Sequence, residues 1–177
     1  MRHFFILGNM GSGTSLLRGL LNAHSFCNVV FEDLQIKNLI RDEFLRWNNL
    51  KNITEKKGCL WGNKIPVDVF DTARWNTNDI LKIGRDYYIL WVIRRFCQFK
   101  NSWNNWQRGQ TLYWEFREKW PKKIIQVSFE DLLLRPDQEL MRICIFLKIK
   151  YEKNMMSGTQ NTGREEYNQT GINLGKL

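Results

Sequence analysis

The chain has 177 residues, of which 43% are hydrophobic and 14% aromatic, a composition that fits a folded domain and excludes a disordered chain. No apolar run reaches the roughly 18 residues that a membrane-spanning helix needs. Lysine and arginine total 27 against 18 aspartates and glutamates, which gives a net charge of +9. This charge attracts anions such as nucleic acid, acidic membranes and phosphorylated or sulfated ligands, although it also suits a solubilising surface.

Apolar and amphipathic segments alternate along the chain. The first apolar run predicts a buried strand at 3–8, and the leucines after it predict a helix at 13–23. In chain order, the pattern then predicts a strand at 27–32, a helix at 33–50, a strand at 59–66, a helix at 67–83, a strand at 87–93, helices at 97–107 and 110–120, a strand at 123–129 and a helix that begins at Pro136. Residues 150–177 are polar and dotted with glycine, and we expect an irregular segment there.

This alternation predicts an α/β fold, namely a three-layer, P-loop-like domain with a central, mainly parallel sheet flanked by helices. Seven consecutive apolar residues at 87–93 suit a strand that is covered on both faces. No linker or repeat interrupts the pattern, so we expect a single domain over 1–177. In sheets of this kind, ligands bind at the carboxyl ends of the strands.

The cysteines do not have the spacing of a metal site. They are widely scattered, no C-x-x-C is present, and the chain has only two histidines, so we expect no bound metal. All four are interpreted as reduced and mostly buried: Cys27, Cys59, Cys97 and Cys144. The first residues contain no signal-peptide pattern, and the expected location is the cytoplasm.

A glycine-rich turn joins the first predicted strand to its helix. Gly8 to Ser15 matches the phosphate-binding loop G-x-x-x-x-G-K-[ST] except that Thr14 replaces the lysine. The glycines allow several backbone N–H groups to face one anion, and the helix adds the positive end of its dipole. The alternative is a plain turn between a strand and a helix.

Two parts of nucleotide-triphosphate chemistry are missing. Without the lysine, the loop lacks the clamp on the β- and γ-phosphates. The most apolar strand is followed by Arg94 and Arg95 rather than by an aspartate that would hold magnesium. An arginine at this position favours a phosphate and disfavours a metal ion.

The loop and the arginine together resemble two motifs of the PAPS-dependent sulfotransferases, enzymes whose donor is 3′-phosphoadenosine 5′-phosphosulfate (PAPS). Ser12-Gly13-Thr14-Ser15, followed by leucines and by Asn22-Ala23-His24-Ser25, is similar to the S-G-T-[ST] core and D-A-H-P-like end of the family's 5′-phosphosulfate loop. Arg94 and Ser102, eight positions apart, match an arginine that closes a strand and a serine on the next helix.

Two further segments resemble the same family. The turn W-G-N-K-I-P at 61–66 is similar to W-G-x-K-x-P, and 127–149 is similar to a stretch that begins v-x-Y-E-D-L. The four motifs stand in the family's order over residues 3–150, and they are most similar to its tyrosylprotein and glycan branch. The resemblance implies a sulfotransferase with PAPS as donor, 3′,5′-ADP (PAP) as product and no metal.

The resemblance also assigns residues to the donor. It implies that the 5′ end of PAPS is held by the loop residues Gly11, Ser12, Gly13, Thr14 and Ser15. It implies that Arg94 and Ser102 hold the 3′-phosphate and that Arg164, in a Gly-Arg pair, belongs to a loop that closes over it. Trp61 and Trp103 lie near matched motifs and are candidates for stacking on adenine.

Arg94 has an alternative role in an ion pair with Glu130 or Asp131, unless Arg95 is that partner. Three positions depart from the family's pattern. Gly11 replaces a lysine or arginine, Arg95-Phe96 replaces D-P, and Phe129 replaces the tyrosine of Y-E-D-L.

Sulfuryl transfer requires a cation at the leaving oxygen and a base for the acceptor's proton. The resemblance, together with the positive charge of Lys64, assigns Lys64 to the bridging oxygen, where it also compensates for Gly11. The alternative is an exposed lysine beside a turn. Glu32, at the end of the second predicted strand, is the expected base, with Asp33 as the neighbouring candidate and helix capping as the alternative role. His24 follows the loop helix directly and is interpreted as a structural residue.

The acceptor is expected to be a glycan, a peptide tyrosine or a small alcohol, and a second subunit of a homodimer could complete the site. A degenerate P-loop phosphotransferase is one alternative function. A basic nucleic-acid-binding module is another, but the basic residues are spread along the chain and no nucleic-acid motif is present. We therefore expect no nucleic acid as a partner.

Overall fold

The structure is a computed structural model that describes residues 3–30, 60–66, 87–95 and 103–160. The strands are β1 (His3–Gly8), β2 (Cys27–Val30), β3 (Leu60–Pro66), β4 (Tyr88–Ile93) and β5 (Ile124–Ser128). The helices are α1 (Thr14–Asn22), α5 (Trp103–Lys119), α6 (Phe129–Leu134), α7 (Pro136–Leu147) and the 3₁₀ helix η3 (Lys153–Gln160). Within these residues a helix follows β1, β4 and β5, as the sequence predicts.

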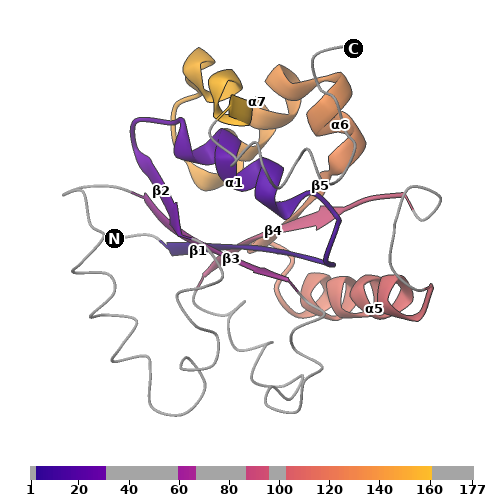
Figure 1. Cartoon of the computed structure of the whole chain (residues 1–177). Coiled ribbons are helices and arrows are strands. Elements are labelled where there is room, and N and C mark those ends of the chain that lie inside the picture. The colour runs from indigo at the N-terminus through magenta and orange to yellow at the C-terminus, as the bar shows by residue number, and fades with distance from the viewer. Residues whose placement is uncertain (1–2, 31–59, 67–86, 96–102, 161–177) are drawn as a thin grey trace.

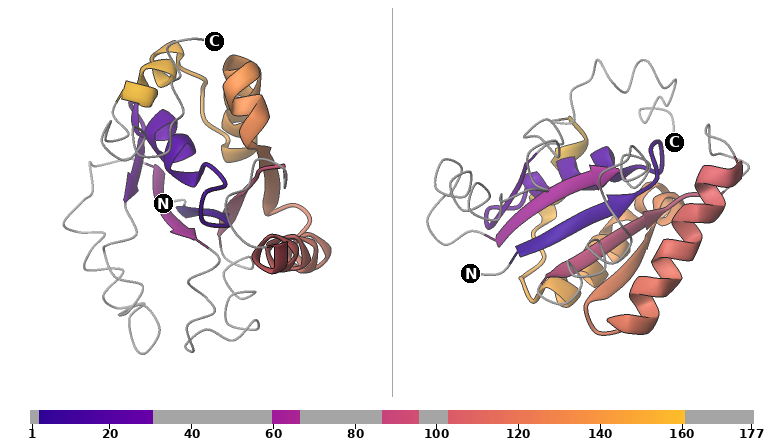
Figure 2. Two further views of the ribbon diagram at one scale, coloured as in Figure 1. Left: turned by 45° about the vertical axis from the view of Figure 1, so that its right-hand side comes forward. Right: turned by 90° about the horizontal axis from the view of Figure 1, so that it is seen from below.

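The five strands form one parallel sheet in the order β2-β3-β1-β4-β5. Helices α1, α6, α7 and η3 cover one face, and α5 covers the other (Figure 1). The two rotated views of Figure 2 show the same three layers. The predicted three-layer α/β fold with a parallel sheet is therefore confirmed.

Both faces of the sheet are packed with apolar side chains. Phe4 and Ile6 of β1 belong to the core that contains the leucines of α1. On the opposite face, Trp91 packs its ring against Phe116 of α5, with ring centroids 5.7 Å apart. Four consecutive residues of β4 are at most 1% exposed: Ile89, Leu90, Trp91 and Val92. This burial confirms the prediction that the apolar strand is covered on both faces.

Helix α5 differs from its prediction. The sequence predicts separate helices at 97–107 and 110–120, whereas one helix of 17 residues runs from Trp103 to Lys119. Gly109, which lies between the two predicted helices, is inside this helix and is buried. The Asn9 side chain packs directly against it.

The fifth strand is shorter than predicted. It ends at Ser128, and Phe129 begins α6. The Ser128 hydroxyl accepts a hydrogen bond from the backbone N–H of Asp131 at 3.1 Å and so caps the helix. The sequence S-x-x-D at this point is a helix-start signal that ends the strand.

The segment after Tyr151 is also more regular than predicted. Residues 153–160 form η3, which lies against α1. Met155 is 0% exposed and belongs to the main core. A Cβ on Gly158 would come within 2.2 Å of the Gly19 carbonyl oxygen, so η3 and α1 are in close contact there.

Several predictions lie outside the described residues, namely the helices at 33–50 and 67–83, and the segment 161–177. Cys27 and Cys144 are buried and reduced, as predicted, while Cys59 and Cys97 also lie outside. Burial raises the pKa of the Cys144 thiol to about 11. None of the helices in the described ranges has the length and hydropathy to cross a membrane.

Candidate anion-binding site at the carboxyl ends of β1, β3 and β4

The central strands place the glycine loop next to the end of β4. Gly8, the last residue of β1, is paired in register with Val92. From β1 the chain continues to β2 on one side of the sheet, whereas from β4 it continues to β5 on the other. The crevice where connections diverge in this way is the usual ligand site of parallel sheets. The loop that follows β1 and Arg94, which follows β4, therefore lie side by side at this edge.

The loop has the backbone conformation of an anion-binding turn. Gly11 and Gly13 have φ angles of 86° and 100°, in the left-handed region that glycine adopts without strain. Gly13 is the N-cap of α1, and among the described residues no side chain caps this helix. The first N–H groups of α1 lack intrahelical partners and lie at the positive end of its dipole. The geometry suits a phosphate or sulfate group.

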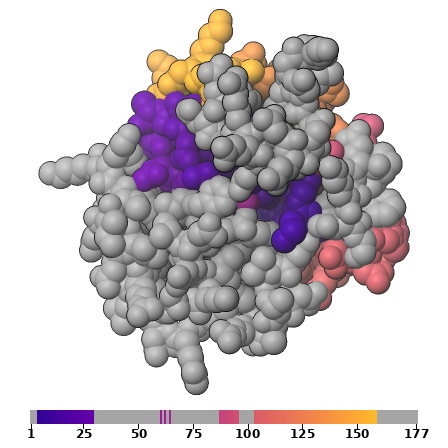
Figure 3. Space-filling view, viewed as in Figure 1, coloured from indigo at the N-terminus to yellow at the C-terminus, as the bar shows by residue number. Residues whose placement is uncertain are grey.

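One buried hydroxyl in the loop has spare hydrogen-bonding capacity. Ser12 is 2% exposed, and its Oγ has no hydrogen-bond partner among the described residues. An unsatisfied buried hydroxyl is costly unless a ligand or solvent satisfies it. Residues of the loop also reach the surface, since Met10 is 53% exposed. In Figure 3, indigo residues from the start of the chain are visible on the surface.

Arg94 lies directly against the loop. Its Nη1 donates a hydrogen bond to the Gly11 carbonyl at 3.2 Å. Its guanidinium stacks on the Phe129 ring, with Cζ 4.4 Å from the ring centroid. The Nε atom of Arg94 is buried and has no hydrogen-bond partner within the described part of the chain. The guanidinium therefore retains donor capacity for an anion.

Phe129 touches both halves of this site. A Cβ on Gly13 would lie 2.2 Å from the Phe129 ring, so the ring packs directly on the loop. The same ring also contacts the Arg94 guanidinium. Sequence reasoning treated Phe129 only as a departure from a tyrosine motif, and this positioning contact was missed.

The acidic residues after β5 have other partners than the Arg94 side chain. Glu130 accepts a hydrogen bond from the backbone N–H of Arg95 at 2.9 Å. Asp131 forms an ion pair with Arg135, and the hydrogen bond from Arg135 lowers the pKa of the Asp131 carboxyl. Within the described part of the chain, neither carboxylate therefore forms the alternative ion pair with the Arg94 side chain.

Lys64 joins the loop from the neighbouring strand. It is paired in register with Ile6 of β1, and it is only 5% exposed. Its Nζ donates a hydrogen bond to the Ser15 hydroxyl at 2.9 Å. A buried ammonium is expensive unless it has anionic or polar partners. The structure therefore brings Lys64 to the first turn of α1, next to the position where the loop lysine is missing.

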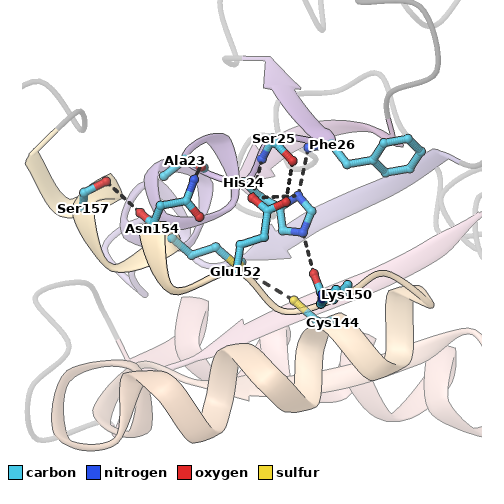
Figure 4. A network of polar contacts seen from close by, with 10 residues as sticks. Ala23, His24, Ser25, Phe26, Cys144, Lys150, Glu152, Asn154 and Ser157 are labelled. Atoms are coloured by element: carbon cyan, nitrogen blue, oxygen red, sulfur yellow. Dashed lines mark hydrogen bonds and ion pairs between the residues drawn. The ribbon is translucent and has the colours of Figure 1, made fainter.

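His24 lies away from this site and is structural, as predicted. Its Nδ1 accepts a hydrogen bond from the Phe26 backbone N–H at 2.9 Å, and its Nε2 donates to the Lys150 carbonyl at 2.7 Å. Figure 4 shows the surrounding network, in which Glu152 accepts from the backbone and hydroxyl of Ser25. These contacts tie the end of α1 to the segment that leads into η3.

Most of the remaining predicted site residues lie outside the described residues. Glu32, Asp33, Ser102 and Arg164 lie outside the described residues, as does the side chain of Trp61. Trp103 is described, and it is 47% exposed at the start of α5, with its ring stacked on Trp106. The described part of the site is therefore the loop, Arg94 and Lys64.

No protein-family model and no curated protein matches the sequence. Solved structures do match the fold. The sulfotransferase domain from the curacin biosynthetic pathway has a TM-score of 0.60 at 16% identity, covering 89% of this chain and 78% of that one. A sulfotransferase from Alicyclobacillus acidocaldarius has a TM-score of 0.57 at 15% identity, with 88% of each chain covered. A mouse sulfotransferase complexed with PAP has a TM-score of 0.58 at 12% identity, covering 94% of this chain and 66% of that one. The predicted resemblance to sulfotransferases is confirmed at the level of the fold.

Proposed function

We propose that the chain is a PAPS-dependent sulfotransferase that transfers a sulfuryl group to a hydroxyl or amine. The observation that carries this proposal is the contact between the glycine loop and Arg94, through the hydrogen bond from Arg94 to Gly11. Two anion-binding elements side by side suit a ligand with two phosphate groups. The unsatisfied Ser12 hydroxyl and Arg94 Nε also fit such a ligand.

Each element has a distinct role in holding the donor. The loop residues Gly11 to Ser15 bind the 5′ end through backbone N–H groups and through the Ser12, Thr14 and Ser15 hydroxyls. Arg94 binds the 3′-phosphate, for which a guanidinium has the right charge and geometry. Ser102 and Arg164 complete this second site.

When bound, PAPS supplies the activated sulfuryl group. Lys64 neutralises the charge that develops on the bridging oxygen, because its ammonium lies beside Ser15 at the loop. Glu32 takes the acceptor's proton, with Asp33 as the neighbouring candidate. The acceptor is a glycan, a peptide tyrosine or a small alcohol, and a second copy of the chain completes its site if the enzyme is a homodimer.

The phosphotransferase alternative has less support. Its loop lysine is replaced by Thr14, and two arginines follow β4 where a metal-binding aspartate would be expected. The nucleic-acid alternative has no motif in its favour.

Nucleotide-dependent stabilisation is the first test. PAP at about 100 times its Kd should raise the melting temperature by about 5 to 10 °C in the presence of EDTA. ATP at the same concentration should have little effect, with or without magnesium. Transfer from radiolabelled PAPS to a panel of glycans, tyrosine peptides and alcohols would then identify the acceptor. Stabilisation by ATP with magnesium, and none by PAP, would reject the sulfotransferase in favour of the phosphotransferase.

A further inference from the structure

We propose that helix α5 positions the glycine loop relative to Arg94, and that Asn9 and Gly109 are the residues through which it does so. This inference rests on the proposed function for the identity of the ligand. The contacts that carry it, however, lie within the chain and involve no ligand.

Asn9 connects the loop to α5. Its backbone carbonyl accepts a hydrogen bond from the Ser12 N–H at 2.9 Å and so closes the first turn of the loop. Its side chain is almost completely buried, with 6% exposed. The side-chain Nδ2 donates to the Asn105 carbonyl of α5 at 2.6 Å. Asn9 thus closes a turn of the loop through its backbone and binds the loop to α5 through its side chain.

Gly109 provides the space for this side chain. A Cβ at Gly109 would lie 1.9 Å from Asn9 Oδ1 and 2.6 Å from Asn9 Cγ. Glycine inside a helix is destabilising relative to alanine, so its position in the middle of α5 needs a local reason. The reason is that Asn9 occupies the volume that any larger side chain would take.

The same turn of α5 also holds the backbone of Arg94. Trp106 donates a hydrogen bond from Nε1 to the Arg94 carbonyl at 3.0 Å. Asn105 and Trp106 are consecutive residues, and one contacts the loop while the other contacts the end of β4. One rigid helical turn therefore fixes the separation of the two anion-binding elements. A small displacement of that turn would misplace one phosphate site relative to the other.

Gly109→Ala is the main test of the proposal. It is compared with Asn9→Ala and with the double variant Asn9→Ala/Gly109→Ala. Thr111→Ala, at an exposed position of α5, is the control. We would measure PAP affinity by calorimetry, melting temperature, and hydrogen exchange of the Ser12 and Gly13 amides without ligand. Gly109→Ala should weaken PAP binding about tenfold or more and accelerate exchange in the loop. The double variant should bind PAP better than Gly109→Ala, because the added methyl group then fills the volume that Asn9 vacates. Thr111→Ala should match the wild type in both measurements.

The outcomes separate positioning from general stability. Wild-type PAP affinity and wild-type loop exchange in Gly109→Ala would overturn the proposal, as would a double variant that binds no better than Gly109→Ala. If Gly109→Ala does not fold, Asn9→Ala decides: accelerated loop exchange with weaker PAP binding supports the proposal, and unchanged exchange overturns it. If the wild type binds no PAP, the proposed function fails, while the exchange measurements still test whether α5 positions the loop.

Discussion

Lys64 places a cation beside a loop that has no lysine of its own. Thr14 stands where a nucleotide-triphosphate loop has that residue, and Gly11 stands where sulfotransferase loops carry a cation. Lys64 of β3 instead has a buried ammonium that lies 2.9 Å from the Ser15 hydroxyl. The cation therefore comes from an adjacent strand rather than from the loop itself.

Replacing Lys64 should affect chemistry more than binding. We expect Lys64→Ala to lower turnover by about 100-fold or more, because the developing charge on the leaving oxygen loses its neutralising partner. The KM for PAPS should change much less, since the loop and Arg94 remain. Steady-state kinetics with the acceptor identified by the transfer assay would measure both values.

Lys123→Ala is a suitable control for the loss of a lysine. Lys123 directly precedes β5 and lies over the Tyr88 ring, at the amino-terminal edge of the sheet. This variant should keep wild-type turnover. Full turnover in Lys64→Ala would exclude Lys64 from the reaction.

The residues with a sequence motif were predictable, and those with only a packing role were not. Ser12 to Ser15 follow a strand directly and precede a helix, so their local pattern predicted the loop. Asn9 and Phe129 have no such pattern. Their roles depend on contacts with Asn105 and Arg94, which lie far away in the sequence.

At the scale of elements, the largest errors concern α5 and η3. Gly109 lies between the two helices that the sequence predicts, and the sequence does not reveal that Asn9 fills the space beside it. The polar composition of 153–160 does not reveal that Met155 is 0% exposed and that its contacts with the core hold η3 in place. In both cases tertiary packing overrides the local signal.

The connection between α1 and η3 should depend on pH. Hydrogen bonds from Ser25, together with the nearby His24, lower the pKa of Glu152 below the ordinary glutamate value of 4.5. A lowered pKa in the folded state stabilises the protein above the unfolded value, and that stability is lost as pH falls through the folded pKa. We expect the melting temperature to fall below pH 4.5 partly for this reason.

Glu152→Gln isolates this contribution. The variant should melt below the wild type at pH 7 and show a smaller further decrease in acid, as followed by thermal unfolding between pH 7 and about pH 3. Glu118→Gln, an exposed position on α5, should keep the wild-type pH profile. Identical pH profiles for Glu152→Gln and the wild type would contradict the role assigned to the Ser25–Glu152 contact.

At the scale of the whole molecule, the sequence predicts the fold class but not the strand order. Alternation of apolar and amphipathic segments is enough to predict a parallel sheet with helices on both faces. The order β2-β3-β1-β4-β5 depends on pairs such as Gly8 with Val92, which no local pattern specifies. This order places the loop, Lys64 and Arg94 at the same edge of the sheet, where they form one candidate site.

The central claim is that the loop and Arg94 hold opposite phosphates of one nucleotide. Calorimetric titration of the wild type and Arg94→Ala with PAP and with 5′-AMP, which lacks the 3′-phosphate, tests it most directly. We predict that Arg94→Ala weakens PAP binding by about 2 kcal/mol or more and leaves 5′-AMP binding nearly unchanged, because only the charge-assisted contact to the 3′-phosphate is lost. Equal losses for the two nucleotides, or none for PAP, would contradict the claim.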